Sequence, residues 1–210
     1  MTIPFFTVII CTYQRAHIIE RALRSLRYQA EDDWEAIIVD DGSTDETEHI
    51  VQRYGEADPR FRYVSKEHEG TAQARNRGVS EARGLFVTFL DSDDEYESDH
   101  LSSRRAMLLA YPTVQLLHGG VRVIGNDMVI DKNNPDAKIH VNDCVVGGTF
   151  IIRRSLFDTI GLFDEIPYAE DAAFFERAEK RAAVIARTDH PTYIYYRDDM
   201  DTLTNTYGQT

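Results

Sequence analysis

The sequence predicts an α/β protein with a mainly parallel sheet flanked by helices, and three observations support this fold class. Short, almost purely apolar runs rich in β-branched residues alternate with segments of helical spacing through the first half of the chain. These runs are apolar throughout, as is typical of strands buried on both faces. Polar and acidic residues directly follow several runs, and ligands on such sheets bind outside the carboxyl ends of the strands.

The first half of the chain alternates strand and helix without interruption. The sequences FFTVIIC at residues 5–11 and WEAIIV at residues 34–39 are typical of buried strands. In chain order we expect a strand at 5–11, a helix at 17–29, a strand at 34–39, a helix at 47–54, a strand at 61–65, a helix at 71–83 and a strand at 85–90. This order favours parallel pairing, because each crossover passes through a helix.

The second half is less regular and is expected to form a smaller β/α portion beside the main sheet. Its expected elements are a helix at 96–111, a strand at 115–124, a polar surface loop at 126–142, a strand at 144–153, a short helix at 155–160, an amphipathic helix at 170–182 and a last strand within 183–196. Residues 201–210 are polar, and we expect them to be frayed.

Length and composition indicate one globular unit. The 210 residues are 42% hydrophobic and 28% charged, which supports one sizeable core and argues against disorder. We therefore expect a single domain over residues 1–210. The formal net charge of −13 opposes broad contact with nucleic acid or anionic lipid, although a local pocket can still bind one small phosphate ligand.

Three features favour a cytoplasmic protein. No apolar run reaches the roughly 18 residues that a membrane-spanning helix needs, which leaves peripheral membrane contact open. The first residues lack the basic region and the long apolar stretch of a signal peptide. Cys11 and Cys144 are too few for a disulfide scaffold or a multi-cysteine zinc site, so we expect reduced thiols.

Acidic side chains gather directly after the strand expected at 85–90. Asp91, Asp93, Asp94 and Glu95 stand so close in sequence that their like charges repel unless a cation is bound. Oxygen ligands of this kind suit Mg²⁺ or Mn²⁺, and Mg²⁺ is usually shared with substrate phosphates. The alternative is a solvated acidic cap on the following helix, whose N-terminus favours negative charge.

Polar residues at two other places suggest a nucleotide pocket. Asp41 follows the strand at 34–39 and can accept hydrogen bonds from a ribose or a base. Tyr13 follows the first strand and can stack on a flat base, and Arg75 can reach a phosphate or a base. The alternatives are a turn with Ser43 as a helix N-cap, plain packing of the tyrosine and a solvated arginine.

Glu170 and Asp171 stand at the start of the helix expected at 170–182, ahead of Phe174 and Phe175. A carboxylate at such a position can serve as a general base, because it can face a cleft while the aromatic residues anchor the helix in the core. The alternative is that the acids only cap the helix.

In their order along the chain, these segments resemble the inverting family 2 glycosyltransferases of the GT-A fold. The resemblance rests on VIICTYQR at 8–15, VDDGSTD at 39–45, ARNRG at 74–78, FLDSDD at 89–94, GTFIIRR at 148–154, GLFDE at 161–165 and Glu170-Asp171. It extends from about residue 5 to residue 197. Any one motif is weak, whereas the ordered set is specific.

The resemblance implies a role for each candidate residue. A nucleoside-diphosphate sugar is expected on residues 1–95 and the acceptor on residues 96–200. The implied donor-binding residues are Thr12, Tyr13 against the base, Arg15, Asp41 on the base, Arg75 beside it, Asp91 facing the ribose, Ser92, and Asp93 holding Mn²⁺ or Mg²⁺ on the diphosphate. The implied acceptor or sugar site comprises Gly147, Gly148, Thr149 and Glu170, with Asp171 as the catalytic base.

The implied reaction is a metal-dependent, inverting transfer of a sugar, from a UDP-sugar by family tendency, to a hydroxyl of a glycan, a lipid-linked glycan or another acceptor. One alternative is a nucleotidyltransferase, which would usually carry a Gly-rich basic loop where TYQR stands at 12–15. Another is a nucleotide-sugar-binding protein without transfer activity, which should have lost Asp93 or Asp171. The donor sugar, the acceptor and the linkage are left open.

The chain departs from the family pattern near its end. Many relatives carry a histidine shortly after a Tyr-Arg pair, whereas Asp198-Asp199-Met200 follows Tyr196-Arg197 here. This departure leaves open whether the C-terminal segment closes over the diphosphate or contributes to the metal shell.

Overall fold

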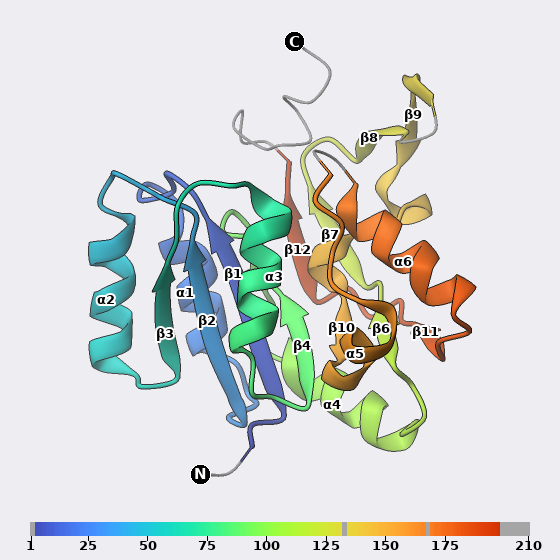
Figure 1. Cartoon of the computed structure of the whole chain (residues 1–210), viewed down its shortest axis with the longest axis horizontal. Helices are drawn as coiled ribbons and strands as arrows, with labels where there is room; N and C mark the ends of the chain where they lie inside the picture. The colour runs from blue at the N-terminus through green and yellow to red at the C-terminus, as the bar shows by residue number, and fades with distance from the viewer. Residues whose placement is uncertain (1–2, 132–133, 167–168, 198–210) are drawn as a thin grey trace.

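A seven-stranded sheet forms the centre of the molecule in the computed structural model, which describes residues 3–131, 134–166 and 169–197 (Figure 1). Its strand order is β11-β6-β10-β4-β1-β2-β3. The strands are β1 (Phe6–Thr12), β2 (Trp34–Asp40), β3 (Phe61–Ser65), β4 (Phe86–Phe89), β6 (Leu116–His118), β10 (Ile151–Arg153) and β11 (Ile185–Arg187). Only β10 runs antiparallel to its neighbours, β4 and β6. The predicted mainly parallel sheet is confirmed.

Helices cover both faces of this sheet, as Figure 1 shows. They are α1 (Glu20–Arg27), α2 (Thr47–Ala57), α3 (Thr71–Glu81), α4 (His100–Ala110), α5 (Phe157–Ile160) and α6 (Glu170–Lys180). Successive strand residues point to opposite faces, so Ile38 joins the apolar cluster under α1, α2 and α4, while Ile37 joins the cluster under α3, α5 and α6. The apolar runs that predicted buried strands therefore fill two cores at once.

A smaller sheet lies beside the main one and corrects three expectations. It consists of β5 (Glu95–Tyr96), β12 (Tyr193–Tyr196) and β7 (Val121–Ile124), with β12 in the middle. The single strand expected at 115–124 is two strands in different sheets. The single strand expected within 183–196 is likewise split into β11 and β12. The helix expected at 96–111 begins at His100, because residues 95 and 96 pair with β12.

The break between β6 and β7 depends on two glycines. Gly119 and Gly120 have positive φ angles of 88° and 76°, a region that favours glycine. A Cβ atom on Gly120 would lie 2.1 Å from the carbonyl oxygen of His190, so a side chain cannot fit there. The chain therefore turns out of the main sheet at this point and enters the smaller one.

Two further segments differ from their expected form. The polar loop expected at 126–142 contains a hairpin of β8 (Met128–Asp131) and β9 (Asn134–His140), followed by the 3₁₀ turn η1 (Val141–Asp143). The strand expected at 144–153 is β10 alone, preceded by the 3₁₀ turn η2 (Gly147–Thr149) and followed by η3 (Arg154–Leu156). Residues 198–210, which include the predicted frayed end, lie outside the described residues.

No helix in the described part of the chain is long and apolar enough to cross a membrane. Cys11 and Cys144 are both free thiols, as expected.

Candidate active site

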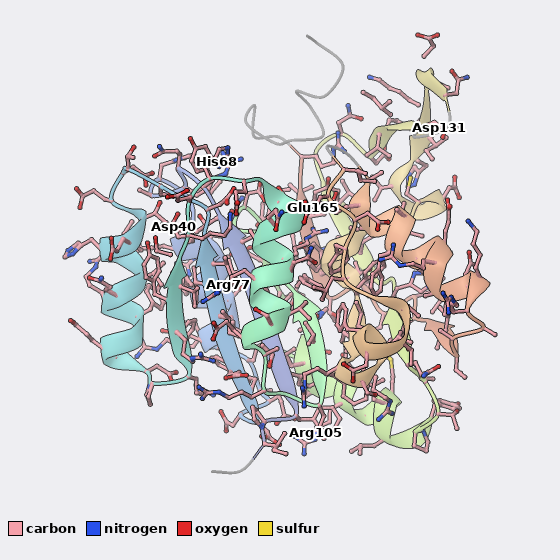
Figure 2. The ribbon with its side chains drawn as sticks, in the orientation of Figure 1. Asp40, His68, Arg77, Arg105, Asp131 and Glu165 are labelled. Atoms are coloured by element: carbon pink, nitrogen blue, oxygen red, sulfur yellow. The ribbon has the colours of Figure 1, made fainter. Side chains whose placement is uncertain are left out.

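A cavity of about 1060 Å³ lies at the carboxyl ends of the central parallel strands. The segments after β1, β2 and β4 line one part of it, and η2, the start of α6 and the β8–β9 hairpin line another. Figure 2 labels His68 and Glu165 at this end of the sheet and Arg105 at the opposite end. The cavity brings together every predicted site residue except Gly148 and Thr149.

Asp41, directly after β2, is buried and anchors the loop between β3 and α3. Its Oδ1 atom lies 2.5 Å from Lys66 Nζ and accepts from the Glu69 backbone N–H at 3.0 Å. Its Oδ2 atom accepts from the Gly70 N–H at 2.8 Å and lies 2.8 Å from His68 Nδ1. Burial favours the neutral acid, but Lys66 and the N–H groups of Glu69 and Gly70 outweigh it and lower the pKa of Asp41. Asp41 is therefore a charged acceptor surrounded by donors from one loop.

Tyr13 already has a flat ring stacked on it. The imidazole of His68 lies parallel to the Tyr13 ring, with the centroids 4.0 Å apart and 20° between the planes. His68 thus faces both the tyrosine and Asp41. Thr12, at the end of β1, is buried, and its hydroxyl has no hydrogen-bond partner among the described residues.

The acidic segment after β4 is folded into the structure, so it does not form the solvated helix cap that was one alternative. Asp94 is fully buried, and its carboxylate accepts from Tyr193 Oη at 2.7 Å and from the Tyr196 N–H at 2.9 Å. Asp93 lines the cavity, and Arg21 donates to its backbone carbonyl. Burial, followed by the charge of Asp91, raises the pKa of Asp93 to about 6.

Asp91 and Asp93 fit a divalent cation that arrives with its substrate. The described residues contain no group of three or more His, Cys, Asp or Glu side chains that could hold a metal by themselves. However, Mg²⁺ is usually bound through one or two carboxylates together with substrate phosphates and waters. Asp93 has this character, because it lines a large cavity and because burial and the charge of Asp91 disfavour its own charge.

Arg75 joins the donor side of the cavity to the start of α6. It projects from α3, is 6% exposed, and donates to Glu170 Oε1 at 2.6 Å and to Asp91 Oδ1 at 3.4 Å. Burial alone would lower the pKa of Arg75, but Glu170, Asp91 and Asp171 outweigh it and raise it. Arg75 is therefore not solvated, which was one alternative from the sequence.

Asp171 lies against η2. Its Oδ2 atom accepts from the Gly147 N–H at 2.8 Å, and a Cβ atom on Gly147 would lie 2.7 Å from Asp171 Cβ. Burial and the neighbouring Glu170 raise the pKa of Asp171, and Arg75 partly opposes them. A half-buried carboxylate with a raised pKa and open access to a cavity is suited to accept a proton.

Gly148 and Thr149 follow Gly147 in η2 but do not line the cavity. A Cβ atom on Gly148 would lie 2.2 Å from Tyr193 Oη. The Thr149 hydroxyl accepts from the Gly119 N–H at 3.0 Å and donates to the Val146 carbonyl at 2.7 Å. Thr149 lines a neighbouring cavity of about 290 Å³. The structure thus separates these two residues from the others predicted for the sugar site.

The family model for glycosyl transferase family 2 matches residues 7–161. The chain belongs to this family. A putative glycosyltransferase of Bacillus subtilis, EpsH, is 39% identical over 100 residues, covering 48% of this chain and 29% of its own length. The GalNAc(5)-diNAcBac-PP-undecaprenol beta-1,3-glucosyltransferase of Campylobacter jejuni is 28% identical over 218 residues, covering 95% of this chain and 68% of its own length.

A solved crystal structure shares the fold of this chain. The crystal structure of TarS 1-349 from S. aureus, in complex with UDP-GlcNAc, matches with a TM-score of 0.79 and 25% identity, over 96% of this chain and 61% of that one. This likeness confirms the predicted GT-A architecture. The chain therefore spans less than two thirds of the length of several proteins it matches.

Sequence reasoning missed several residues in and around the cavity. Lys66 and His68 surround Asp41, and Tyr193 ties the acidic segment to the last described strand. Val129 and Ile139 of the β8–β9 hairpin also line the cavity. No local motif marks these positions, although Gly70 at the start of α3, with a φ of 98°, signals a tight loop ahead of it.

Proposed function

We propose that the chain is a metal-dependent, inverting glycosyltransferase that moves a sugar from a nucleoside-diphosphate sugar to a hydroxyl of an acceptor. One observation supports this most: Asp93, which fits a metal-diphosphate group, and the half-buried carboxylate of Asp171, which is suited to accept a proton, line the same cavity. Membership of glycosyl transferase family 2 supports it independently.

The donor is proposed to bind on the half formed by residues 1–95. Tyr13 stacks on the base, Asp41 accepts a hydrogen bond from it, and Asp91 faces the ribose. Thr12, Arg15, Arg75 and Ser92 complete the donor side, and all of them line the cavity. Because TarS binds UDP-GlcNAc with this fold, we propose a UDP-sugar as the donor.

The divalent cation, Mn²⁺ or Mg²⁺, is proposed to bind through Asp93 and the diphosphate. When bound, it would neutralise the charge that develops on the leaving diphosphate. Burial and the charge of Asp91 raise the pKa of Asp93, so a nearby cation would stabilise its charged form.

The acceptor is proposed to bind on the half formed by residues 96–200, with Asp171 as the base. Asp171 takes the proton of the acceptor hydroxyl while that oxygen attacks the anomeric carbon opposite the leaving group. The bond from that carbon to the diphosphate oxygen breaks, and a single displacement inverts the configuration. Gly147 supports this role, because its N–H holds the carboxylate in place.

The acceptor class is proposed from a relative. The Campylobacter jejuni glucosyltransferase acts on an undecaprenol-diphosphate-linked glycan according to its name, and it matches nearly the whole of this chain. We therefore propose a lipid-linked or free glycan as the acceptor, reached from the cytoplasm through peripheral contact with the membrane.

The test is turnover of UDP-GlcNAc and UDP-glucose with Mn²⁺ by the wild type and by Asp171→Asn. If Asp171 is the base, the substitution should lower kcat by about 10²-fold or more, since positioned bases contribute 10²–10⁴. If it only caps α6, Asn should serve about as well as Asp. UDP affinity should stay near wild type, which separates loss of the base from loss of the donor site.

The alternatives give other outcomes in the same assay. A nucleotidyltransferase would release pyrophosphate from UTP and a sugar 1-phosphate and would not cleave a UDP-sugar. A nucleotide-sugar-binding protein would bind UDP without turnover. A fully active Asp171→Asn enzyme would contradict the proposed base.

A further inference from the structure

Resting on the proposed function, we infer that Arg75 and Glu170 are a positioning pair for Asp171. The ion pair with Arg75 occupies the carboxylate of Glu170. Of these two neighbouring acids, only Asp171 then remains to take the acceptor's proton. The pair also connects the base to the donor side, because Arg75 contacts Asp91 as well.

The position of Arg75 is fixed by its surroundings. Its guanidinium carbon lies 5.5 Å from the ring centre of Phe89 and 5.8 Å from that of Phe163. Two adjacent aromatic rings, whose centres are 5.4 Å apart, and two carboxylates lie against this guanidinium and limit its freedom to turn away. The packing around the guanidinium therefore supports its 2.6 Å contact with Glu170.

Gly147 allows the three charged groups to approach each other. A Cβ atom at this position would lie 2.8 Å from Asp171 Oδ2 and 3.0 Å from Arg75 Nη1. Asp171 accepts only two hydrogen bonds in the described structure, from the Gly147 and Ala172 N–H groups. A carboxylate has about four acceptor positions, so Asp171 retains capacity for an acceptor hydroxyl.

The charged and titratable groups around Asp171 come from several elements. They are Glu170 on its own helix, Arg75 on α3, Cys144 ahead of η2 and, beyond the guanidinium, Asp91 after β4 and Cys11 on β1. Burial raises the pKa of Asp171 most, Glu170 raises it further, and Arg75 and the two N–H groups lower it. Removing Glu170 or Arg75 should therefore shift the titration of Asp171 in opposite directions.

The experiment compares the pH dependence of UDP-GlcNAc and UDP-glucose hydrolysis for wild type, Arg75→Gln and Glu170→Gln. The acidic limb of kcat reports the base in the bound complex. We expect Arg75→Gln to move that limb to higher pH and Glu170→Gln to move it to lower pH, each by about 1 unit, the shift that a nearby charge typically causes. A purely structural role would lower kcat in both variants without these opposite shifts.

Arg77→Gln is the matched control. Arg77 lies on the same helix and pairs with Glu81 at 2.8 Å on the surface, so its loss removes one positive charge and one ion pair away from the cavity. Its pH profile should match the wild type. Thermal unfolding of all variants checks that they fold.

A second measurement works without turnover. The carboxyl carbon of Asp171 in ¹³C-labelled protein, assigned by its loss in Asp171→Asn, reports its titration directly by NMR. Opposite shifts in the two variants support the inference, and shifts in one direction or none overturn it. If the shifts appear but no UDP-sugar is cleaved, the proposed function fails while the electrostatic pair stands. If Asp171→Asn is inactive but both variants titrate like wild type, only the inference fails.

Discussion

Asp93 and Asp94 are neighbours in the sequence, but their carboxylates have different surroundings. Asp94 accepts from Tyr193 and Tyr196 and is fully buried, so it holds the acidic segment against the last described strand. Asp93 faces the cavity, and its pKa of about 6 shows that burial and Asp91 disfavour its charge. Of these two neighbours, Asp93 is thus the one whose charged form a cation in the cavity would stabilise.

The first prediction follows from this difference. UDP should bind much more tightly with Mn²⁺ or Mg²⁺ than with EDTA, and Asp93→Ala should abolish that difference while leaving the fold intact. Isothermal calorimetry with and without the metal measures it. Asp158→Ala, an exposed acid on α5, is the control and should keep the metal effect. Equal UDP affinity with and without metal in the wild type would contradict the placement.

At the scale of elements, the loop between β3 and α3 holds a ring where the base is proposed to bind. His68 stacks on Tyr13, and its Nδ1 atom lies 2.8 Å from Asp41. A flat base with a ring N–H would use the same tyrosine face and the same carboxylate. If the base binds as proposed, we expect it to displace His68. The apparent affinity for UDP would then be reduced in proportion to the fraction of molecules in which His68 has left this position.

The second prediction concerns that displacement. His68→Ala should tighten UDP binding by about 3- to 10-fold, because an aromatic stack of ordinary strength no longer competes with the base. Asp41→Ala should do the opposite and weaken UDP binding by about 1–3 kcal/mol, the usual cost of a lost buried partner. Calorimetry measures both. Weaker binding by His68→Ala would mean that the imidazole contacts the base.

The same elements show what the sequence can predict. The runs around Ile9 and Ile37 mark strands because a strand buried on both faces needs apolar residues at every position. The break at Gly119-Gly120 was not predicted, since it depends on His190, which is far away in sequence. In the site, motif residues such as Asp41 were predicted, but His68 was not. The position of His68 depends on the conformation of the loop between β3 and α3.

At the scale of the whole molecule, His100 lies where the smaller sheet packs on α4. Its ring stacks on Tyr96 at 3.8 Å, and its Nδ1 atom lies 2.9 Å from Thr192 Oγ1. The side chain is fully buried, and its Nε2 atom has no partner among the described residues. Burial and, next, the charge of Arg104 hold the pKa of His100 well below its usual value.

The last prediction is a pH dependence of stability that His100 causes. Between its folded pKa and the unfolded value of about 6.5, the unfolded chain binds a proton that the folded chain does not. The free energy of unfolding should therefore fall as the pH drops below about 6.5, by up to about 1.4 kcal/mol per pH unit from this residue. Asp93 and Asp171 oppose the trend, because their raised pKa values mean that the folded chain binds protons more tightly.

The comparison with His100→Gln isolates the histidine, since both proteins share those acids. Glutamine can still hydrogen-bond with Thr192 but does not titrate. Urea unfolding between about pH 7.5 and pH 5 should show a steeper loss of stability for the wild type than for the variant, even if the variant is less stable at neutral pH. If the stability of both proteins fell equally with pH, the prediction would be wrong. His100 would then gain its charge without loss of stability, which would require the fold to open between the smaller sheet and α4.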